Sequence, residues 1–350
     1  MVVRSGKAQA RRRFTLHVAA AAAGALLLAV SSGSALAAAK YELSYATFFP
    51  ATHAHTALAT EWAKEVEKRT KGVVKINIFP GATLTPPDQT YDSVTKGIAD
   101  IGMSVASYSK GRFPLSEVID LPLGYTSGIQ ATRLANAYYQ KFQPKEFADS
   151  KMMYVMAYGP GVFHTKKPIG KLEDLKGLKI RCTGTSAKVV AALGATPVAM
   201  PMTETYDAIQ KGVVEGYVAP QESLKGFKMG EVVSNTTQNF GSSFSLFFFI
   251  AMNKQKWDSL PKDVQATIEK VNQEWIDKSG RVWDQIEKEG FEFAHSKGVK
   301  VVRLSKAEDV RWAETVKPII TDYVANTKAK GLPGEEALKF CQEWLKKNPT

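Results

Sequence analysis

Cysteine and histidine are scarce in this chain of 350 residues, which has two cysteines and five histidines. Cys182 and Cys341 stand far apart, and no group of His, Cys, Asp and Glu residues has the spacing typical of metal ligands. His53 and His55 are two positions apart, but no further ligand accompanies them. We therefore expect no metal and no cofactor. We expect the cysteines to be free buried thiols, with a disulfide as the alternative in an oxidising compartment.

The chain also lacks the short motifs of several large enzyme classes. It contains no Gly-x-Ser-x-Gly, no His-Glu-x-x-His and no phosphate-binding P-loop. No pair of carboxylates occurs in a context typical of acid–base catalysis. These absences predict a protein that is not an enzyme, and turnover of a bound compound would identify an enzyme instead.

Positive charge is abundant but dispersed. The formal net charge is +12, and five basic residues with no acid lie in the first 37 residues. The other lysines and arginines occur mostly singly, without the interleaved aromatic residues of a nucleic-acid surface. The composition therefore argues against nucleic acid as a partner, and the modest positive field suits acidic solutes.

Long apolar runs are confined to the N-terminus. A basic start that includes Arg11, Arg12 and Arg13 leads into the apolar run 18–30, then into small residues that end in Ala35-Leu36-Ala37. This pattern predicts a signal peptide over residues 1–37, removed near Ala37, for export by the Sec or the twin-arginine route. No later run approaches the twenty apolar residues of a membrane-spanning helix.

The first part of the exported chain alternates between strand and helix patterns. Residues 41–49, 73–79 and 98–104 predict strands, and residues 52–70 and 88–97 predict the helices between them. Strands joined through helices of this length form a parallel sheet. The fold class is therefore α/β.

The later part predicts a second domain and two crossings between the domains. A strand over 152–158 ends at the breaker Gly159-Pro160-Gly161, and residues 166–219 build the second domain. The nearly continuous apolar run 244–251 predicts a buried strand that crosses back. A helix of more than thirty residues is predicted over 261–295, followed by a strand over 300–304 and helices over 307–328 and 335–346.

One arginine stands at the centre of the second domain. Arg181 ends a short alternating run and is followed by the small-residue loop 183–186 and a helix that starts near Ala187. In open α/β sheets, ligands bind at the edge where strands end and helices begin. A guanidinium there can hold a carboxylate through two parallel hydrogen bonds.

Several sequence blocks together resemble one known family. The blocks 96–101, 167–169, 172–181, 192–198, 204–212, 214–216 and 253–261 occur in the order and at the spacing of the solute-binding subunit of TRAP transporters, the DctP-type family. The resemblance runs over essentially the whole exported chain. It implies a two-lobed periplasmic-binding-protein (Venus flytrap) fold with mixed sheets flanked by helices and one long helix that spans both lobes. We expect lobe I to comprise 38–159 and 247–286, and lobe II to comprise 160–246 and 287–350.

The resemblance also implies a function. A protein of this family would be a periplasmic receptor that captures an organic acid by its carboxylate and delivers it to a TRAP permease. The expected partners are the small and large membrane subunits of that permease, and the receptor itself is expected to be a monomer. A sensor kinase or an ATP-driven importer is the alternative partner for the same cleft.

At several expected pocket positions, this chain has a less polar residue than its relatives have. At positions where relatives carry polar or charged side chains, this chain has Phe48, Val105, Tyr108, Met202 and Ala219. These departures predict an aromatic or otherwise apolar monocarboxylate, with a dicarboxylate or a sugar acid as the alternative.

Further residues complete the expected pocket. Phe163 and Phe247 are assigned to its apolar wall, with core packing as the alternative, and Tyr206, Tyr217 and Gln221 are assigned as polar contacts. The full expected ligand-binding set is Arg181, Phe48, Tyr108, Phe163, Met202, Tyr206, Tyr217, Gln221, Phe247, Val105 and Ala219.

Overall fold

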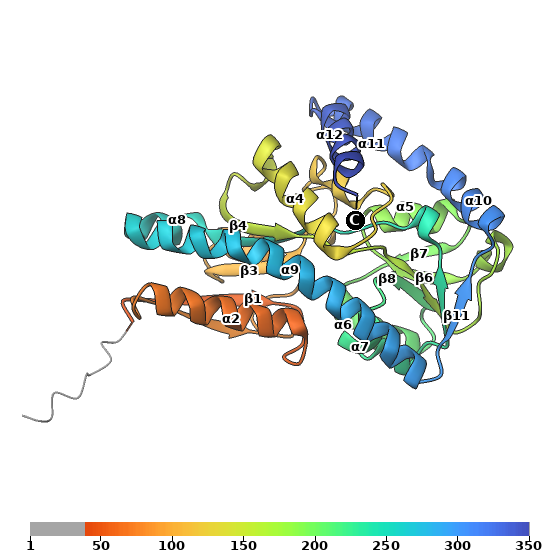
Figure 1. Ribbon diagram of the computed structural model, residues 1–350, viewed down its shortest axis with the longest axis horizontal. Coiled ribbons are helices and arrows are strands. Elements are labelled where there is room, and N and C mark those ends of the chain that lie inside the picture. The colour runs from red at the N-terminus through yellow and green to blue at the C-terminus, as the bar shows by residue number, and fades with distance from the viewer. Residues whose placement is uncertain (1–38, 350) are drawn as a thin grey trace, which may run out of the picture. The chain divides into compact units, whose positions relative to one another are not determined.

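A computed structural model describes residues 39–349. The predicted signal peptide therefore lies outside the described residues. The described chain contains two β-sheets, whose strands form two separate groups in Figure 1. Helices flank both sheets, as the resemblance implied.

The first sheet has the strand order β2-β1-β3-β10-β4. β1 (Tyr41–Thr47) pairs in parallel with β2 (Val74–Phe79) and with β3 (Ile101–Val105). β10 (Phe248–Asn253) runs antiparallel between β3 and β4 (Ser150–Met156). The parallel arrangement predicted for the first three strands is confirmed, and the returning strand makes the sheet mixed.

The second sheet has the strand order β11-β9-β5-β8-β6-β7. Its strands are β5 (Val162–Thr165), β6 (Lys179–Cys182), β7 (Thr196–Ala199), β8 (Gly216–Ala219), β9 (Asn235–Gln238) and β11 (Lys300–Arg303). β6 is parallel to β7 and β8, whereas β5 is antiparallel to β8 and β9. The carboxyl end of β6 leads into the helix α5 (Thr185–Ala192), and β7 leads into α6 (Met202–Gln210).

The chain crosses between the sheets at β4 to β5 and again at β9 to β10. The two crossing segments touch where the backbone N–H of Gly161 donates to the carbonyl of Phe244 at 2.8 Å. The predicted strand 244–251 becomes regular only from Phe248. Just before this strand, a side chain provides the hydrogen bond to the backbone, because the Asp120 carboxylate accepts from the N–H of Phe247 at 2.7 Å.

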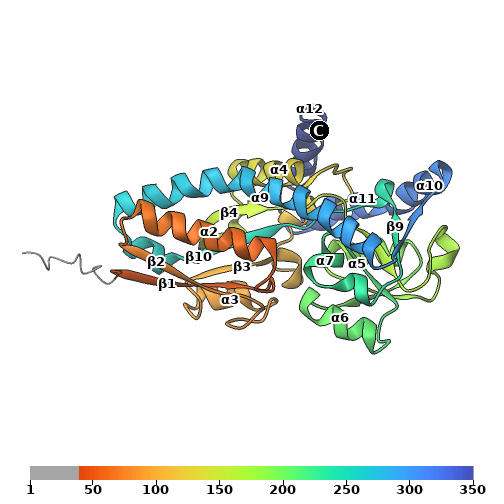
Figure 2. The same ribbon diagram turned by 60° about the horizontal axis from the view of Figure 1, so that its bottom comes forward.

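The long helix α9 (Lys262–Ser296) runs past both sheets, as Figure 2 shows, and confirms the predicted lobe-spanning helix. It contacts α2 (Ala54–Arg69), α4 (Gly128–Phe142) and β4, and near its end it contacts α7 (Ser223–Gly226). The indole N–H of Trp62 on α2 donates to Asn272 Oδ1 on α9 at 2.9 Å. The described residues thus form two lobes that share one helix.

The C-terminal helices contact both lobes. α10 (Lys306–Val316) packs against residues 240–242 and α5, whereas α12 (Gly334–Lys347) packs against α4. The hydroxyl of Tyr323 on α11 (Pro318–Ala329) donates to the carbonyl of Leu115 at 2.8 Å. The single helix predicted over 307–328 is instead two helices, because Pro318 lacks the N–H that would continue the first one.

Three smaller elements complete the described secondary structure: α3 (Thr90–Thr95), α8 (Lys254–Ser259) and short 3₁₀ turns, of which Ala106–Tyr108 bears on the site. Cys182 and Cys341 are both buried and unpaired. Burial raises the pKa of Cys182 to about 11 and that of Cys341 to about 12, which makes both thiols unreactive near neutral pH. Within residues 39–349, no helix combines the length and apolar character needed to cross a membrane.

Two glycines allow neighbouring segments to approach α9 closely. A Cβ added at Gly280 would lie 2.6 Å from the Cα of Ile129, and one at Gly290 would lie 2.3 Å from the carbonyl oxygen of Gln221. Real Cβ atoms do not approach backbone this closely, so α4 and the segment after β8 would have to move away. The second contact matters for the site, because Gln221 precedes a residue that lines the pocket.

We expect Gly280→Ala and Gly290→Ala each to lower the free energy of unfolding by about 1–3 kcal/mol, because of this crowding. Without this crowding, alanine would raise the free energy of unfolding by roughly 0.5–1 kcal/mol, because it is a better helix former than glycine. A decrease in the free energy of unfolding therefore indicates the crowding. Urea unfolding followed by circular dichroism measures it. Lys288→Ala, at an exposed position of the same helix, is the control and should stay within about 0.5 kcal/mol. Stabilisation by either alanine would contradict the close approach.

Candidate functional site

A pocket lies where the ends of strands from both sheets meet α9. It encloses about 360 Å³ of space between atoms, part of it open to solvent. Its lining residues are Phe48, Phe49, Val105, Tyr108, Tyr158, Arg181, Met202, Val218, Ala219, Pro220, Glu222, Ser223, Phe227, Leu246, Phe248 and Trp283.

Arg181 supplies the positive charge of this pocket. Its side chain extends from β6 and the residue is 3% exposed. Nε donates to the carbonyl of Met200 at 2.9 Å, and Nη2 donates to the hydroxyl of Tyr108 at 3.4 Å. No acidic residue within the described part of the chain forms an ion pair with it. A buried charge without a counter-ion is costly, so this geometry favours an anion from outside the protein.

Tyr108 connects the two lobes beside this arginine. It belongs to the turn Ala106–Tyr108 that follows β3 of the first sheet. Its hydroxyl oxygen accepts from Arg181 and from the backbone N–H of Met202 at 3.1 Å, and both donors lie in the second lobe. Because the oxygen accepts both bonds, its own hydrogen remains available to an acceptor in the pocket.

Aromatic side chains form a large part of the pocket wall. Phe48 lies 5.5 Å from Tyr108 in an edge-on arrangement and 6.4 Å from both Phe227 and Phe248, measured between ring centroids. Trp283 of α9 closes this wall, with its ring 5.4 Å from Phe248. Rings of this kind offer apolar area and favourable offset or edge-on contacts to a further ring.

Tyr158 contributes a buried hydroxyl with no partner among the described residues. It follows β4 and lines the same pocket as Arg181. Burial raises the pKa of Tyr158 well above its ordinary value, so the group stays neutral and can donate a hydrogen bond. Its position just before Gly159-Pro160-Gly161, at the carboxyl end of a strand, is the signal that would have identified it from the sequence.

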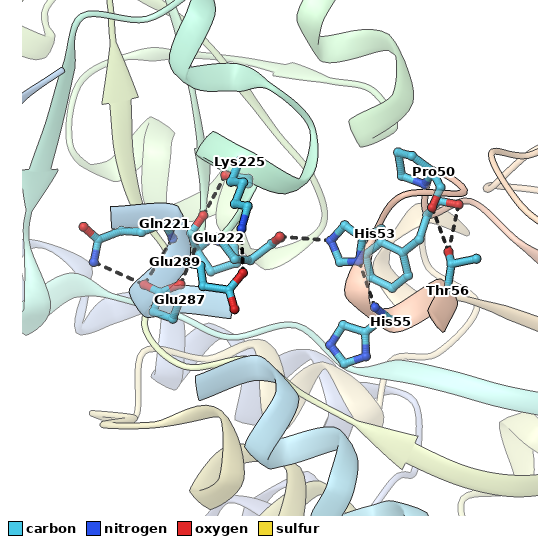
Figure 3. A network of polar contacts seen from close by, with 12 residues as sticks. Pro50, His53, His55, Thr56, Gln221, Glu222, Lys225, Glu287 and Glu289 are labelled. Atoms are coloured by element: carbon cyan, nitrogen blue, oxygen red, sulfur yellow. Dashed lines mark hydrogen bonds and ion pairs between the residues drawn. The ribbon is translucent and has the colours of Figure 1, made fainter. Parts of the chain in front are cut away.

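Glu222 is the acidic residue of the pocket lining, and Figure 3 shows its surroundings. Nε2 of His53 lies 3.0 Å from its Oε2, and both side chains are almost fully buried. Nδ1 of His53 accepts from the backbone N–H of His55 at 3.1 Å, which caps α2. Since Nδ1 accepts, the ring hydrogen is on Nε2 and is donated to Glu222.

The segment that carries Glu222 is fastened to α9. The Glu287 carboxylate accepts from the backbone N–H of Gln221 at 3.1 Å and from that of Glu222 at 3.0 Å. Lys225 forms an ion pair with Glu289 at 2.7 Å on the same helix. These contacts, visible in Figure 3, hold the segment between α2 and α9.

The structure brings six of the eleven predicted residues together around this pocket. They are Phe48, Val105, Tyr108, Arg181, Met202 and Ala219. Val105 and Ala219 end their strands and Phe48 directly follows its strand, whereas Arg181 is the last but one residue of β6.

The other five predicted residues do not line it, mainly because neighbouring residues of a strand point to opposite faces. Phe163 packs edge-on against Trp312, and Phe247 packs against Tyr138 and Phe147, whereas its neighbour Phe248 faces the pocket.

The three predicted polar contacts are engaged elsewhere. Tyr217 stacks on His164 and shares a 2.9 Å hydrogen bond with Ser223, while its neighbour Val218 faces the pocket. Gln221 is bound to Glu287, and Tyr206 reaches Glu231 at the surface.

The comparisons with known proteins identify the family of this chain. Residues 45–327 match the bacterial extracellular solute-binding protein family 7, DctP. This chain belongs to that family. Its members are transport receptors and not enzymes, they bind small organic acids, and they work with a TRAP permease in the periplasm.

Three relatives show the extent of the similarity. A TRAP periplasmic solute-binding protein from Desulfovibrio salexigens, solved as an open complex, is 36% identical with a TM-score of 0.77, over 89% of this chain and 97% of that one. One from Rhodoferax ferrireducens, in complex with copurified benzoate, is 28% identical with a TM-score of 0.83, over 87% and 98%. The C4-dicarboxylate-binding periplasmic protein DctP of Rhodobacter capsulatus is 25% identical over 80% of this chain and 85% of its own length.

We expect the stability of this receptor to depend on the protonation of Glu287. Burial raises the pKa of Glu287 from 4.5 to about 7 in the folded protein. The folded state therefore binds the proton more tightly than the unfolded state, and the stabilisation from this group is present below pH 4.5 and is lost as the pH rises to about 7. Relative to Glu287→Gln, the wild type should lose about 1–3 kcal/mol of unfolding free energy across this window. Urea unfolding at pH 4.5, 5.5, 6.5 and 7.5 measures the difference, and parallel profiles would contradict the burial effect.

Proposed function

We propose that this receptor captures an aromatic or otherwise apolar monocarboxylate in the pocket around Arg181. The observation that carries the proposal is the buried guanidinium that has no acidic partner in the described chain and lines an aromatic pocket. In such a site a carboxylate provides the missing counter-charge and accepts two charge-assisted hydrogen bonds. The free hydrogens of the Tyr108 and Tyr158 hydroxyls add donors beside it.

The charges around the pocket support one carboxylate and not two. Arg181 is the only lysine or arginine in the pocket lining. The acid in that lining is Glu222, which carries the same charge as a carboxylate. A second carboxylate on the ligand would therefore lose its hydration, find no cation and face a like charge. This is the main argument against a dicarboxylate, although a C4-dicarboxylate-binding relative is of comparable identity.

The chemistry of the wall supports an apolar ligand body. Phe48, Phe49, Phe227, Phe248 and Trp283 offer ring faces and edges. A sugar acid would have to leave several hydroxyl groups without partners against these rings, at a cost for each. The structurally similar protein from Rhodoferax ferrireducens binds benzoate, a monocarboxylate of this type.

The remaining parts of the proposal concern location and partners. We propose that residues 1–37 direct export by the Sec or twin-arginine route and are removed near Ala37, so that the receptor acts in the periplasm. Lobe I (38–159 and 247–286) and lobe II (160–246 and 287–350) would close on the ligand about the crossing at Gly159-Pro160-Gly161, because contacts to both lobes form only in the closed state. The closed monomer would then dock on the small and large membrane subunits of a TRAP permease.

We expect Arg181→Lys to weaken binding of the ligand about tenfold or more, because an ammonium cannot reproduce the two parallel hydrogen bonds of the guanidinium. Isothermal titration with benzoate measures the change. Arg303→Lys, at an exposed position in β11 of the same sheet, is the matched control and should bind as the wild type does. Equal affinity of the Arg181 variant and the wild type would exclude Arg181 as the anchor.

We also expect a panel of acids to divide by the number of carboxylates and by polarity. Benzoate and related aromatic monocarboxylates should bind, whereas succinate, malate and galacturonate should bind at least about a hundredfold more weakly, because they bring a second charge or several hydroxyls into an aromatic pocket. Titration calorimetry of ligand-stripped protein gives the ranking. A dicarboxylate or sugar acid as the tightest ligand would refute the proposed ligand class.

A further inference from the structure

Two buried charges of opposite sign line the pocket, and neither is neutralised by the protein. Arg181 is 3% exposed and has no acidic partner among the described residues. Glu222 is 4% exposed and has no lysine or arginine within ion-pairing distance, because nearby Lys225 pairs with Glu289. The two charges are also not paired with each other. A single ligand that contacts both is the simplest way to compensate both.

Glu222 is under-supplied with hydrogen-bond donors. Its Oε2 accepts from Nε2 of His53, whereas its Oε1 has no hydrogen bond to a described residue and is not fully enclosed. A buried carboxylate has about four acceptor positions, and charged groups left with few partners inside a protein are costly. The position of the hydrogen on His53 is set by the cap of α2, so the imidazole cannot offer a second hydrogen to this carboxylate.

Tyr158 indicates that the two charges act on one region of the pocket. After burial and the neighbouring Asp120, its pKa is affected by Arg181, which lowers it, and by Glu222, which raises it. Tyr158, Arg181 and Glu222 also line the same pocket.

We propose that Glu222, positioned by His53, accepts a hydrogen bond from a donor on the ligand, and that the ligand is an aromatic monocarboxylate bearing a ring hydroxyl or amino group. The inference rests on the proposed function and makes its ligand class more specific. The carboxylate would bind Arg181, the ring would pack between the aromatic walls, and the donor would meet Oε1 of Glu222. Glu222 thus favours ligands that carry the donor, because a ligand without it leaves Oε1 of Glu222 without a hydrogen bond.

The test compares ligands that differ only in the donor. Calorimetric affinities are measured for benzoate, for 3- and 4-hydroxybenzoate, for the 3- and 4-methoxybenzoates, and for 3- and 4-aminobenzoate. The best hydroxyl or amino isomer should bind wild type roughly tenfold more tightly than benzoate, since a hydrogen bond to a charged acceptor is among the stronger ones. The methoxy compound at the same position should lose that gain, because it keeps the oxygen but has no hydrogen to donate.

Variants assign the gain to Glu222. In Glu222→Gln the ratio of the hydroxybenzoate affinity to the benzoate affinity should fall about fivefold, because a neutral amide oxygen replaces the carboxylate. Glu222→Asp, which keeps the charge but withdraws the oxygen by one methylene, should also lower the ratio. Glu269→Gln, an acid on α9 that pairs with Lys151 outside the pocket lining, is the control and should leave the ratio within twofold of wild type.

The outcomes separate this inference from the proposed function. If benzoate binds as tightly as every hydroxylated and aminated isomer, the inference is wrong and the monocarboxylate receptor stands. If the preference exists but survives both Glu222 variants, the donor is recognised elsewhere and the inference is wrong. A variant that merely loses structure lowers both affinities by the same factor, leaves the ratio unchanged and therefore also counts against it. If no aromatic acid binds at all, the proposed function itself fails.

Discussion

The guanidinium of Arg181 is the group on which the rest of the site depends. It is buried at the end of β6, where its only described partners are the carbonyl of Met200 and the hydroxyl of Tyr108. A protein interior tolerates such a charge only if its compensation arrives from elsewhere. The aromatic wall strengthens this demand, because rings exclude the water that would otherwise solvate the cation. The proposed anion binding would thus be a consequence of how the chain folds and not of a surface patch.

The site also depends on contacts between segments that are distant in sequence. Tyr108 comes from the first lobe and accepts hydrogen bonds from two groups of the second. His53 and Glu222 form a second connection of this kind, 169 residues apart in the chain. Both connections flank the pocket, so the two lobes approach each other where the ligand is expected to lie. In the proposed function, closure and recognition would be physically coupled, because the same side chains would serve both.

The helix α9 provides the rigid reference for these contacts. It extends over 35 residues and contacts α2, α4 and α7 in turn. Its Glu287 holds the backbone at Gln221 and Glu222, and its Trp283 is part of the pocket wall. Gly290 permits the segment to lie directly on the helix. A helix that crosses both lobes thereby sets the position of Glu222 and contributes Trp283 to the same pocket.

Much of this architecture follows from local pattern in the sequence. Three features depend only on residues that are close in the sequence. They are the alternation of strands and helices over the first hundred residues of the exported chain, the long amphipathic helix, and the arginine at a strand end. Which side chains face the pocket and which distant residues pair depends on the tertiary structure and cannot be predicted from local sequence pattern. Whether Phe247 or Phe248, and whether Tyr217 or Val218, faces the pocket depends on strand register, which a shift of one residue reverses. The pairing of His53 with Glu222 and the unpartnered hydroxyl of Tyr158 depend on long-range packing, because hydrogen-bond satisfaction is a property of the folded neighbourhood and not of the residue itself.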